Sequence, residues 1–388
     1  MNNKIKILFH YSRLNIGGAE RSTLRLMKAL VDNGWDVTLV LNVGDGSLEK
    51  KIDSRIKVIH FFPKPWKAII VNQKNKLVKI ILLIYYALPI LYYSVSTIII
   101  KNRFKNKKYD AAIISLQGLD PKFVCEYVHA KKRFLYIRND LREIPKKSVY
   151  SNIKKYNDCL NGYLCVSNTA LESLDTINNI YKEKAYVLYN IIDFDNIITQ
   201  ANAEKDPFFK YRKENIPILV TVCRMADVAK AIFRQLEIAI ELKSRGIEFQ
   251  WFFVGDGPDL GELRKRIVEN KMENSIFVLG EKNNPYPYIK YSDVVCVLSY
   301  FEGLAGVVNE AKTLGKPVIA TQFSGINEQL IDEENGLIVE NDYQSILKGL
   351  ERLLTDRELR VSLQNNFLGS GIDDNNLKIA TLKKIIEK

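Results

Sequence analysis

Two glutamates eight residues apart, Glu302 and Glu310, are the most informative pair in this chain. An apolar run over 294–298 precedes them and predicts a buried strand, and residues 307–314 have the pattern of a helix with small and apolar residues on one face. One carboxylate would then lie in the loop between strand and helix, and the other about one turn inside the helix. Glycines in that loop would let backbone N–H groups at the helix start approach an anionic group, as in a nucleotide sugar. A capped helix with a solvated glutamate is the alternative.

Two cations are predicted at a sheet edge in the same half of the chain. Arg224 follows a strand-like run over 218–222, and Lys230 lies six residues later near a helix start. Because ligands of doubly wound sheets bind at the carboxyl ends of the strands, these cations could bind a diphosphate there. Gly255 opens a similar strand-to-helix turn, Gly255-Asp256-Gly257-Pro258. Ordinary surface charge and a simple tight turn are the alternatives.

A glycine pair marks a comparable turn in the first half of the chain. Gly17 and Gly18 follow a strand-like run over 5–11 and precede a helical pattern over 20–33. Backbone without a Cβ can come close to a phosphate or a sugar, so the pair is a candidate ligand loop. A turn glycine is the simpler alternative.

Strand-like runs alternate with helical patterns through both halves, which predicts an α/β chain with two Rossmann-like, doubly wound parallel sheets. Residues 1–200 would form an N-terminal domain and residues 201–370 a C-terminal domain, with polar residues 195–216 as the connection. A helix within 371–388 is expected to pack back toward the N-terminal domain. The predicted strands are 5–11, 37–43, 56–62, 111–116, 133–137, 162–166, 185–188, 218–222, 249–254, 276–279, 294–298 and 318–321.

Positive charge is concentrated in the first half of the chain. The net charge is +12; residues 1–200 hold 32 Lys and Arg against 17 Asp and Glu, whereas residues 201–388 hold 25 against 28. A basic half suits nucleic acid, anionic lipid or a phosphorylated substrate, or only solubility. Residues 80–100 carry no charge and lie inside a basic stretch, 64–108. Since both flanks are basic and sheet strands lie on both sides, we predict a membrane-surface segment rather than a span; a buried helical hairpin is the alternative.

The cysteines and histidines give no sign of a metal site. Five cysteines form no Cys-x-x-Cys pair and several lie in apolar runs, so we expect reduced core residues in a cytoplasmic protein. The three histidines share no ligand-like spacing, which predicts no metal. The first apolar stretch is short and strand-like, so no signal peptide is expected. Neither G-x-x-x-x-G-K-[ST] nor G-x-S-x-G occurs, which argues against P-loop and serine-hydrolase chemistry.

Taken together in chain order, these motifs resemble one family. The order is that of the retaining GT-B glycosyltransferases of family four, or group 1, and it is found here in Gly17-Gly18-Ala19-Glu20, Arg224 with Lys230, Gly255-Asp256-Gly257-Pro258 and the Glu302/Glu310 pair. The resemblance covers residues 5–345 and implies a GT-B fold with two Rossmann-like domains facing a cleft. The N-terminal domain would bind the acceptor and the C-terminal domain the nucleotide sugar.

The resemblance also implies roles for individual residues. Glu310 looks like the family's ribose-binding carboxylate, and Glu302 like the carboxylate beside the donor sugar. Arg224 and Lys230 resemble the cations that offset charge on the leaving diphosphate, a task that in this family replaces a metal ion. The other residues expected to contact the donor are Gly17 and Gly18 from the opposite domain, Gly255, and the backbone of Leu304, Ala305, Gly306 and Val307.

Some positions depart from the family pattern. Residues 136–140 read Tyr-Ile-Arg-Asn-Asp, so Asn139 stands where many members have a histidine. An Arg-Asn-Asp version is found in relatives that build lipid-linked oligosaccharides, and Asp140 is kept as a candidate catalytic contact to donor or acceptor. Ala231 replaces the usual glycine or arginine after the phosphate lysine.

The favoured function is a retaining, metal-independent glycosyltransferase that moves a hexose or N-acetylhexosamine from a nucleotide sugar, preferably a UDP-sugar, to a lipid-linked or polysaccharide acceptor. It would make capsule, lipopolysaccharide or another surface glycan. The protein would be cytoplasmic and attached peripherally to the inner face of the cell membrane through residues 64–108. It would need no cofactor besides the nucleotide-sugar donor and would bind no nucleic acid. The alternatives are a non-catalytic basic module that binds membrane or nucleic acid, and a GT-B sugar-nucleotide epimerase. A binding module leaves unexplained why four charged residues are expected on one sheet edge.

Overall fold

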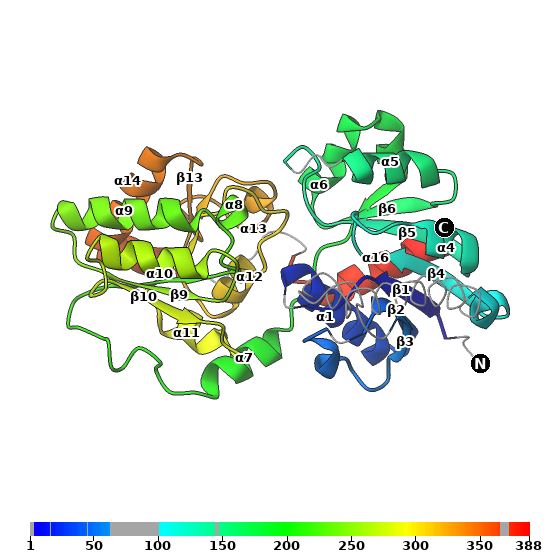
Figure 1. Cartoon of the computed structure of the whole chain (residues 1–388), viewed down its shortest axis with the longest axis horizontal. Coiled ribbons are helices and arrows are strands. Elements are labelled where there is room, and N and C mark those ends of the chain that lie inside the picture. Colours follow the sequence, from blue (N-terminus) through cyan, green and yellow to red (C-terminus); the bar gives the residue numbers. More distant parts are fainter. Residues whose placement is uncertain (1–3, 16, 45, 63–100, 144–146, 365–371) are drawn as a thin grey trace, which may run out of the picture. The chain divides into compact units, whose positions relative to one another are not determined.

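The computed structural model describes residues 4–15, 17–44, 46–62, 101–143, 147–364 and 372–388 (Figure 1). The predicted membrane-surface segment therefore lies, up to residue 100, outside the described residues. The chain forms two compact units. The N-terminal unit comprises Met1–Val166, Leu171–Ile191 and Asn376–Lys388, and the C-terminal unit comprises Ser167–Ala170 and Ile192–Asn375.

The N-terminal unit is built on a seven-stranded parallel sheet with the order β3-β2-β1-β4-β5-β6-β7. Its strands arise from apolar runs whose side chains are buried on both faces, as expected of a parallel sheet covered by helices. Their bounds agree with the sequence prediction to within a few residues. They are β1 (Lys6–Tyr11), β2 (Asp36–Val43), β3 (Lys57–Phe62), β4 (Lys108–Ile114), β5 (His129–Ile137), β6 (Gly162–Cys165) and β7 (Ala185–Val187).

The C-terminal unit repeats this plan with a six-stranded parallel sheet, ordered β10-β9-β8-β11-β12-β13. Its core gathers around Trp251, Phe252 and Phe253, three consecutive β9 side chains that are fully buried. The strands are β8 (Ile218–Val222), β9 (Gln250–Val254), β10 (Ile276–Gly280), β11 (Val294–Val297), β12 (Val318–Thr321) and β13 (Leu337–Val339). The sequence prediction missed β13, which has only three residues.

Helices connect the strands in both units (Figure 1). Those of the N-terminal part are α1 (Gly18–Asp32), α4 (Lys122–Tyr127), α5 (Lys147–Tyr156) and α6 (Asn168–Glu172), with short 3-10 helices η1 (Glu49–Lys51), η2 (Ser173–Thr176) and η3 (Asn179–Lys184). Those of the C-terminal unit are α7 (Phe194–Asn202), α8 (Asp227–Lys230), α9 (Ile232–Ser244), α10 (Leu260–Glu269), α11 (Tyr286–Tyr291), α12 (Gly306–Thr313), α13 (Ile326–Gln329), α14 (Tyr343–Thr355) and α15 (Arg357–Ser362). Helix α16 (Asn375–Glu387) follows them in the chain and belongs, from Asn376 on, to the N-terminal unit.

Two features of the chain path depart from the sequence prediction. Residues 195–216 do not form an irregular connection throughout, because α7 occupies its start and buries Ile197 and Ala201. In addition, the short segment Ser167–Ala170 belongs to the C-terminal unit. Glu328 on α13 holds it, since its carboxylate accepts hydrogen bonds from the backbone N–H of Asn168 at 2.9 Å and from the Thr169 hydroxyl at 3.1 Å.

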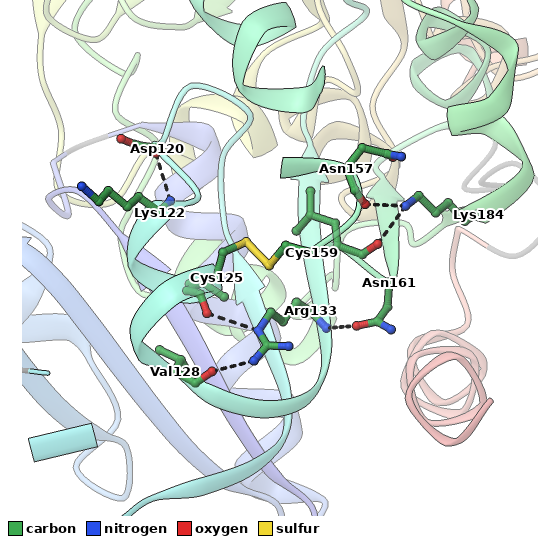
Figure 2. Close-up of a disulfide and its surroundings, with 11 residues drawn as sticks. Asp120, Lys122, Cys125, Val128, Arg133, Asn157, Cys159, Asn161 and Lys184 are labelled. Atoms are coloured by element: carbon green, nitrogen blue, oxygen red, sulfur yellow. Dashed lines mark hydrogen bonds between the residues drawn. A yellow bond between two sulfur atoms is a disulfide. The ribbon is translucent and has the colours of Figure 1, made fainter. Parts of the chain in front are cut away.

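The prediction of reduced cysteines is wrong for two of the five. Cys125 of α4 and Cys159, which follows α5, form a disulfide in the N-terminal unit (Figure 2). The prediction failed because the two thiols are far apart in sequence and only the fold brings them together. Cys165 and Cys296 are free and buried, and Cys223 is free and partly buried.

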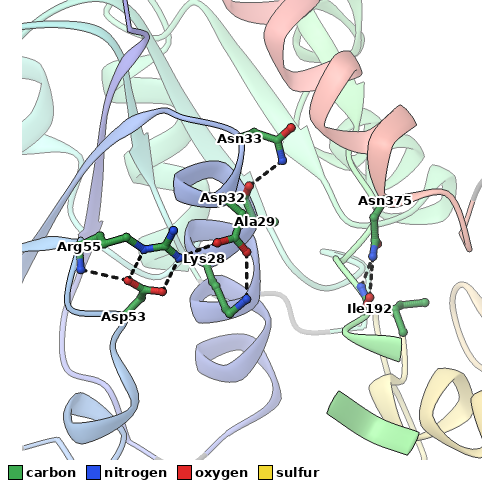
Figure 3. Close-up of polar contacts among 8 residues, drawn as sticks. All are labelled: Lys28, Ala29, Asp32, Asn33, Asp53, Arg55, Ile192 and Asn375. Carbon is green, nitrogen blue, oxygen red and sulfur yellow. Dashed lines mark hydrogen bonds and ion pairs between the residues drawn. The ribbon is translucent and has the colours of Figure 1, made fainter. Parts of the chain in front are cut away.

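Helix α1 and helix α16 are both fixed by polar contacts at their ends (Figure 3). At the end of α1, Asp32 accepts hydrogen bonds from Lys28 at 2.9 Å and from Arg55 at 2.5 Å. Arg55 also pairs with Asp53, but exposed pairs of this kind contribute little to stability. At the start of α16, the Asn375 side chain both accepts from the backbone N–H of Ile192 (3.1 Å) and donates to its carbonyl (2.6 Å).

Candidate functional site

The charged residues singled out in the C-terminal unit lie at the point where the strand order of its sheet reverses. Strand β8 has β9 on one side and β11 on the other. From β8 the chain adds strands toward one edge of the sheet, and from β11 it adds them toward the other edge. The loops after β8 and β11 leave the sheet at the same carboxyl edge. A crevice forms at such a point in doubly wound sheets, and it is where they bind ligands. Arg224 and Lys230 follow β8, and Glu302 follows β11.

Lys230 and Glu302 form an ion pair across this crevice. Ser299 adds a third contact, because its hydroxyl donates to Oε1 of Glu302 at 3.0 Å. Burial lowers the pKa of Lys230, but the charge of Glu302, the neighbouring Cys223 thiol and the hydrogen bond to Glu302 together outweigh this effect and raise the pKa on balance. The ammonium group is therefore kept charged. Burial also raises the pKa of the neighbouring Cys223 thiol to about 12, which favours its protonated form.

A buried chain of hydrogen bonds fixes the backbone of Lys230. The indole N–H of Trp251 donates to the Thr221 hydroxyl (3.0 Å), which donates to Oε1 of Gln235 (2.8 Å). The amide of Gln235 then donates to the carbonyl of Lys230 at 2.8 Å. The next residue, Ala231, has a φ of 50°, a left-handed conformation that costs a non-glycine residue about 1–2 kcal/mol. The chain of hydrogen bonds thus holds a strained turn beside the ion pair.

A second group of side chains holds the loop after β11. Arg234 donates to the carbonyl of Leu298 at 3.0 Å, and Asn341 donates to the carbonyl of Tyr300 at 2.7 Å. The guanidinium of Arg234 also lies over the Tyr300 ring, 4.3 Å from its centre. These contacts fix the course of the loop just before Glu302.

The end of the same loop is fixed from α13 and the turn before it. Gln329 is fully buried, accepts from the backbone N–H of Ala305 and donates to its carbonyl, both at 2.9 Å. The turn before α13 packs directly on Gly303, because a Cβ at Gly325 would lie 2.2 Å from the Gly303 carbonyl oxygen. Gly325 also has a φ of 80°, so both space and conformation require glycine there.

Helix α12 starts beside this loop without a side-chain cap at Ala305. Gly306 is exposed and has open space next to it. Its backbone N–H and that of Val307 are among the first of the helix, which have no partner within the helix and attract anions. Leu304 is half-buried, and Glu310 lies further along the helix with its side chain buried.

Arg224 and Gly255 differ in how far the structure accounts for them. Arg224 is exposed at the sheet edge, and no carboxylate among the described residues forms an ion pair with it. Gly255 has a clear packing reason, since a Cβ there would lie 1.8 Å from the carbonyl oxygen of Cys223, and its φ is 142°. The backbone hydrogen bond from Met225 to Asp256 (3.0 Å) joins the same two loops. Gly255 therefore lets the loops after β8 and β9 lie against each other.

The remaining predicted residues belong to the N-terminal unit and follow its own central strands. Gly17 precedes α1 in an extended conformation, and Gly18 is the first residue of the helix, with open space beside it. Asp140 is buried after β5. Its carboxylate accepts hydrogen bonds from Arg142, including one of 2.6 Å to the guanidinium and one of 2.8 Å to the backbone N–H.

The structure adds a residue to which the sequence prediction gave no role. Arg138 is buried after β5, and its guanidinium donates to Ser22 (2.9 Å), Thr23 (2.8 Å) and Asn190 (3.0 Å). It therefore attaches the second turn of α1, close after Gly17 and Gly18 in sequence, to the end of the sheet. A cation directly after a buried strand was the available sequence signal.

The C-terminal unit matches a known family. Residues 202–367 fit the family model described as glycosyl transferases group 1. The C-terminal unit therefore contains a group 1 glycosyltransferase domain. Its structure resembles the Anabaena protein HepE, solved in complex with UDP, with a TM-score of 0.72, 17% identity and 99% of both chains covered. It also resembles Staphylococcus aureus TarM, with a TM-score of 0.73, 14% identity, and 99% of this chain and 100% of that one covered. The fold of this chain is accordingly GT-B.

Curated relatives carry names from glycan synthesis. The N-acetylgalactosamine-N,N'-diacetylbacillosaminyl-diphospho-undecaprenol 4-alpha-N-acetylgalactosaminyltransferase of Campylobacter jejuni is 29% identical over 236 residues, which is 60% of this chain and 60% of that protein. Two further relatives are matched over only 41% of their own length. The capsular polysaccharide biosynthesis glycosyltransferase CapH of Staphylococcus aureus is 24% identical, with 98% of both chains covered.

Among the described residues, no three His, Cys, Asp or Glu side chains are grouped closely enough to hold a metal ion. Within the same part of the chain, no helix combines the length and the apolar character needed to cross a bilayer.

Proposed function

We propose that this protein transfers a hexose or an N-acetylhexosamine from a nucleotide sugar, preferably a UDP-sugar, to a lipid-linked or polysaccharide acceptor during surface glycan synthesis. The observation that carries the proposal is the meeting of Arg224, Lys230, Glu302 and the uncapped start of α12 at the switch point of the C-terminal sheet. Support comes from the names of relatives that act on a diphospho-undecaprenol substrate or in capsule synthesis, and from the UDP bound to HepE.

The proposed donor site assigns opposite charges to opposite parts of the donor. The diphosphate would lie against Arg224, Lys230 and the first N–H groups of α12, where fixed positive charge stabilises the leaving nucleotide. Glu310 would accept hydrogen bonds from the ribose hydroxyls, and Glu302 would lie beside the sugar ring. Since Lys230 and Glu302 contact each other in this structure, binding of a donor would exchange part of that ion pair for contacts to phosphate and sugar.

The reaction would retain the configuration of the sugar and need no metal ion, because the protein cations offset the charge of the diphosphate. The acceptor would bind to the N-terminal unit, in which Asp140 is the proposed contact to the donor or the acceptor, whereas Gly17 and Gly18 would contact the donor diphosphate. No enzymic nucleophile is assigned, since the leaving phosphate itself would help to deprotonate the acceptor hydroxyl.

Substitutions in the donor site test the proposal. Glu310→Ala should weaken UDP binding about tenfold, because a ribose contact to a charged group contributes about 1.5–3 kcal/mol. Arg224→Ala should lower the rate of UDP release from UDP-sugars more than it weakens UDP binding. Isothermal titration and a coupled UDP assay would measure both quantities. If both variants bind and turn over like the wild type, the assignment is wrong.

Peripheral attachment to the inner membrane face is a separate part of the proposal. It rests on the basic residues that follow the uncharged run, of which Lys101, Arg103 and Lys105 are exposed. Anionic headgroups attract such residues by about 1 kcal/mol each. Flotation with anionic liposomes should bring the protein to the top of the gradient, and neutralising these three residues should reduce that fraction. Flotation that is absent, or unchanged in the variant, would refute the attachment but not the donor site.

A further inference from the structure

A basic cavity lies in the N-terminal unit at the edge of the sheet opposite to the predicted acceptor edge. Its volume is about 860 Å³, and its lining comes from the starts of β1, β4 and β5 together with the last residues of α16. The strands of the sheet are all parallel, so their amino ends share this edge. No residue proposed to take part in sugar transfer lines the cavity.

The lining carries a marked excess of positive charge. Seven of its residues are Lys or Arg, whereas only Asp110 and Glu387 are acidic. Asp110 is already engaged, because its carboxylate accepts from Lys131 at 2.8 Å and from the backbone N–H of Lys6 at 2.9 Å. The cavity therefore has little negative charge of its own to balance the cations.

Arg133 has a structural task rather than a ligand-binding one. Its guanidinium donates to the carbonyl oxygens of Val128 at 2.9 Å and Val124 at 3.3 Å, which closes the turn between α4 and β5 (Figure 2). Asn161 accepts from its backbone N–H at 2.8 Å. The cations available to a ligand are accordingly the lysines.

Four of these lysines, Lys4, Lys6, Lys108 and Lys132, form no ion pair with any carboxylate in the part of the chain that the structure describes. The cavity places them together although they come from the starts of three strands. The adjoining surface is also positive: burial lowers the pKa of Lys107, and the nearby charges of Lys57 and Arg103 lower it further. Such a concentration of like charge is unfavourable unless an anion offsets it.

We propose that this cavity is a binding site for a multiply charged phosphate ligand. Its volume falls in the range of small-molecule sites, about 300–1,000 Å³. Several lysines around one cavity match the spread charge of a polyphosphate or of a phosphorylated headgroup, because each ammonium acts as a point charge for phosphate oxygens. His129, which also lines the cavity, can donate a further hydrogen bond.

The experiment uses the full chain and a triple variant, Lys4→Gln, Lys6→Gln and Lys132→Gln. A matched control removes three positive charges elsewhere, with Lys147→Gln, Lys154→Gln and Lys210→Gln, all of which are exposed. The probes are inorganic tripolyphosphate, followed by isothermal titration, and vesicles of phosphatidylglycerol in phosphatidylcholine, followed by co-sedimentation. UDP binding serves as a folding control, since the cavity lies in the other unit from the proposed donor site.

Binding of tripolyphosphate should weaken about tenfold or more in the cavity variant and stay near the wild-type value in the control variant, as expected when three partly screened charge contacts are lost. Weakening confined to vesicles would assign the site to lipid headgroups instead of soluble phosphate. Equal losses in both variants would mean that only net charge matters, and an unaffected cavity variant would mean that no site exists; either result overturns the proposal. If both variants still bind UDP, the result concerns the cavity alone and leaves the proposed transferase function untouched.

Discussion

Replacing Gln235 by leucine tests whether the buried hydrogen-bond chain positions Lys230. The substitution keeps the size of the side chain but removes its bonds to the Thr221 hydroxyl and the Lys230 carbonyl. Each buried polar group left without a partner costs about 1–3 kcal/mol, so the loss of both bonds should lower the free energy of unfolding by about 2–6 kcal/mol. Part of this loss would be avoided if the turn at Ala231 abandons its left-handed conformation, which would move Lys230 away from Glu302.

The expected consequence is a weaker donor site as well as a less stable fold. UDP affinity should fall about tenfold, or 1.4 kcal/mol, because Lys230 would no longer be held where the diphosphate is proposed to bind. Urea unfolding measures the stability. Isothermal titration with UDP measures the affinity, in buffer without urea and at a temperature at which the wild type and the variant are both folded.

Gln250→Leu is the matched control for this substitution. Gln250 is also a buried glutamine of the C-terminal sheet, and its amide donates to the Tyr211 carbonyl at 2.7 Å, away from the loops of the donor site. It should lower stability and leave UDP affinity unchanged. Equal effects of the two substitutions on UDP affinity, or an unchanged affinity in Gln235→Leu despite lost stability, would refute a positioning role for Gln235.

Three further predictions concern buried groups. Lys312 is fully buried, its ammonium donates to the Leu363 carbonyl at 3.1 Å, and burial lowers its pKa to about 8. The free energy of unfolding should therefore fall by up to about 3 kcal/mol as the pH drops from 10.5 through 8. Lys312→Met should raise the free energy of unfolding at pH 7, and urea titrations at pH 10 should show a much smaller gain. Burial lowers the pKa of His10 to about 4, so the protein should lose about 3 kcal/mol of stability as pH falls from 6.5 toward 4, and His10→Gln should lack this component in the same titration. The disulfide joins Cys125 to Cys159, 34 residues apart, and its reduction should lower the free energy of unfolding by about 4 kcal/mol through loop-closure entropy. Thermal unfolding with and without reductant measures this loss. Five reactive thiols in the unfolded, unreduced protein would show that the disulfide does not exist.

The strands could be predicted closely because their signal is local. Runs such as Ile218–Val222 are apolar on both faces and end at polar or glycine residues, so length and composition suffice to find them. The convergence of Lys230 and Glu302, 72 residues apart, could also be anticipated, since parallel strands place their carboxyl ends at one edge. Strand β13 escaped notice because three residues carry too little pattern.

The residues that hold the site could not be predicted in the same way. Gln235, Gln329 and Arg234 look like ordinary helix residues, and their tasks depend on partners that are distant in sequence. The pairing of Cys125 with Cys159 likewise depends on how α4 and the end of α5 meet. Sequence patterns report which face a side chain occupies, whereas these roles are set by a single hydrogen bond or covalent bond to a particular atom.

The contact between Ile192 and Asn375 bears on how the two units share one chain. These residues are the two ends of the main segment of the C-terminal unit, and they are joined in both directions by hydrogen bonds (Figure 3). Apart from Ser167–Ala170, the C-terminal unit is therefore one continuous stretch of chain with joined ends. The N-terminal unit is completed only by residues from beyond this stretch, since Leu382, Ile385 and Ile386 of α16 belong to its core. The unit proposed to bind the donor is thus an insertion into the chain of the unit proposed to bind the acceptor.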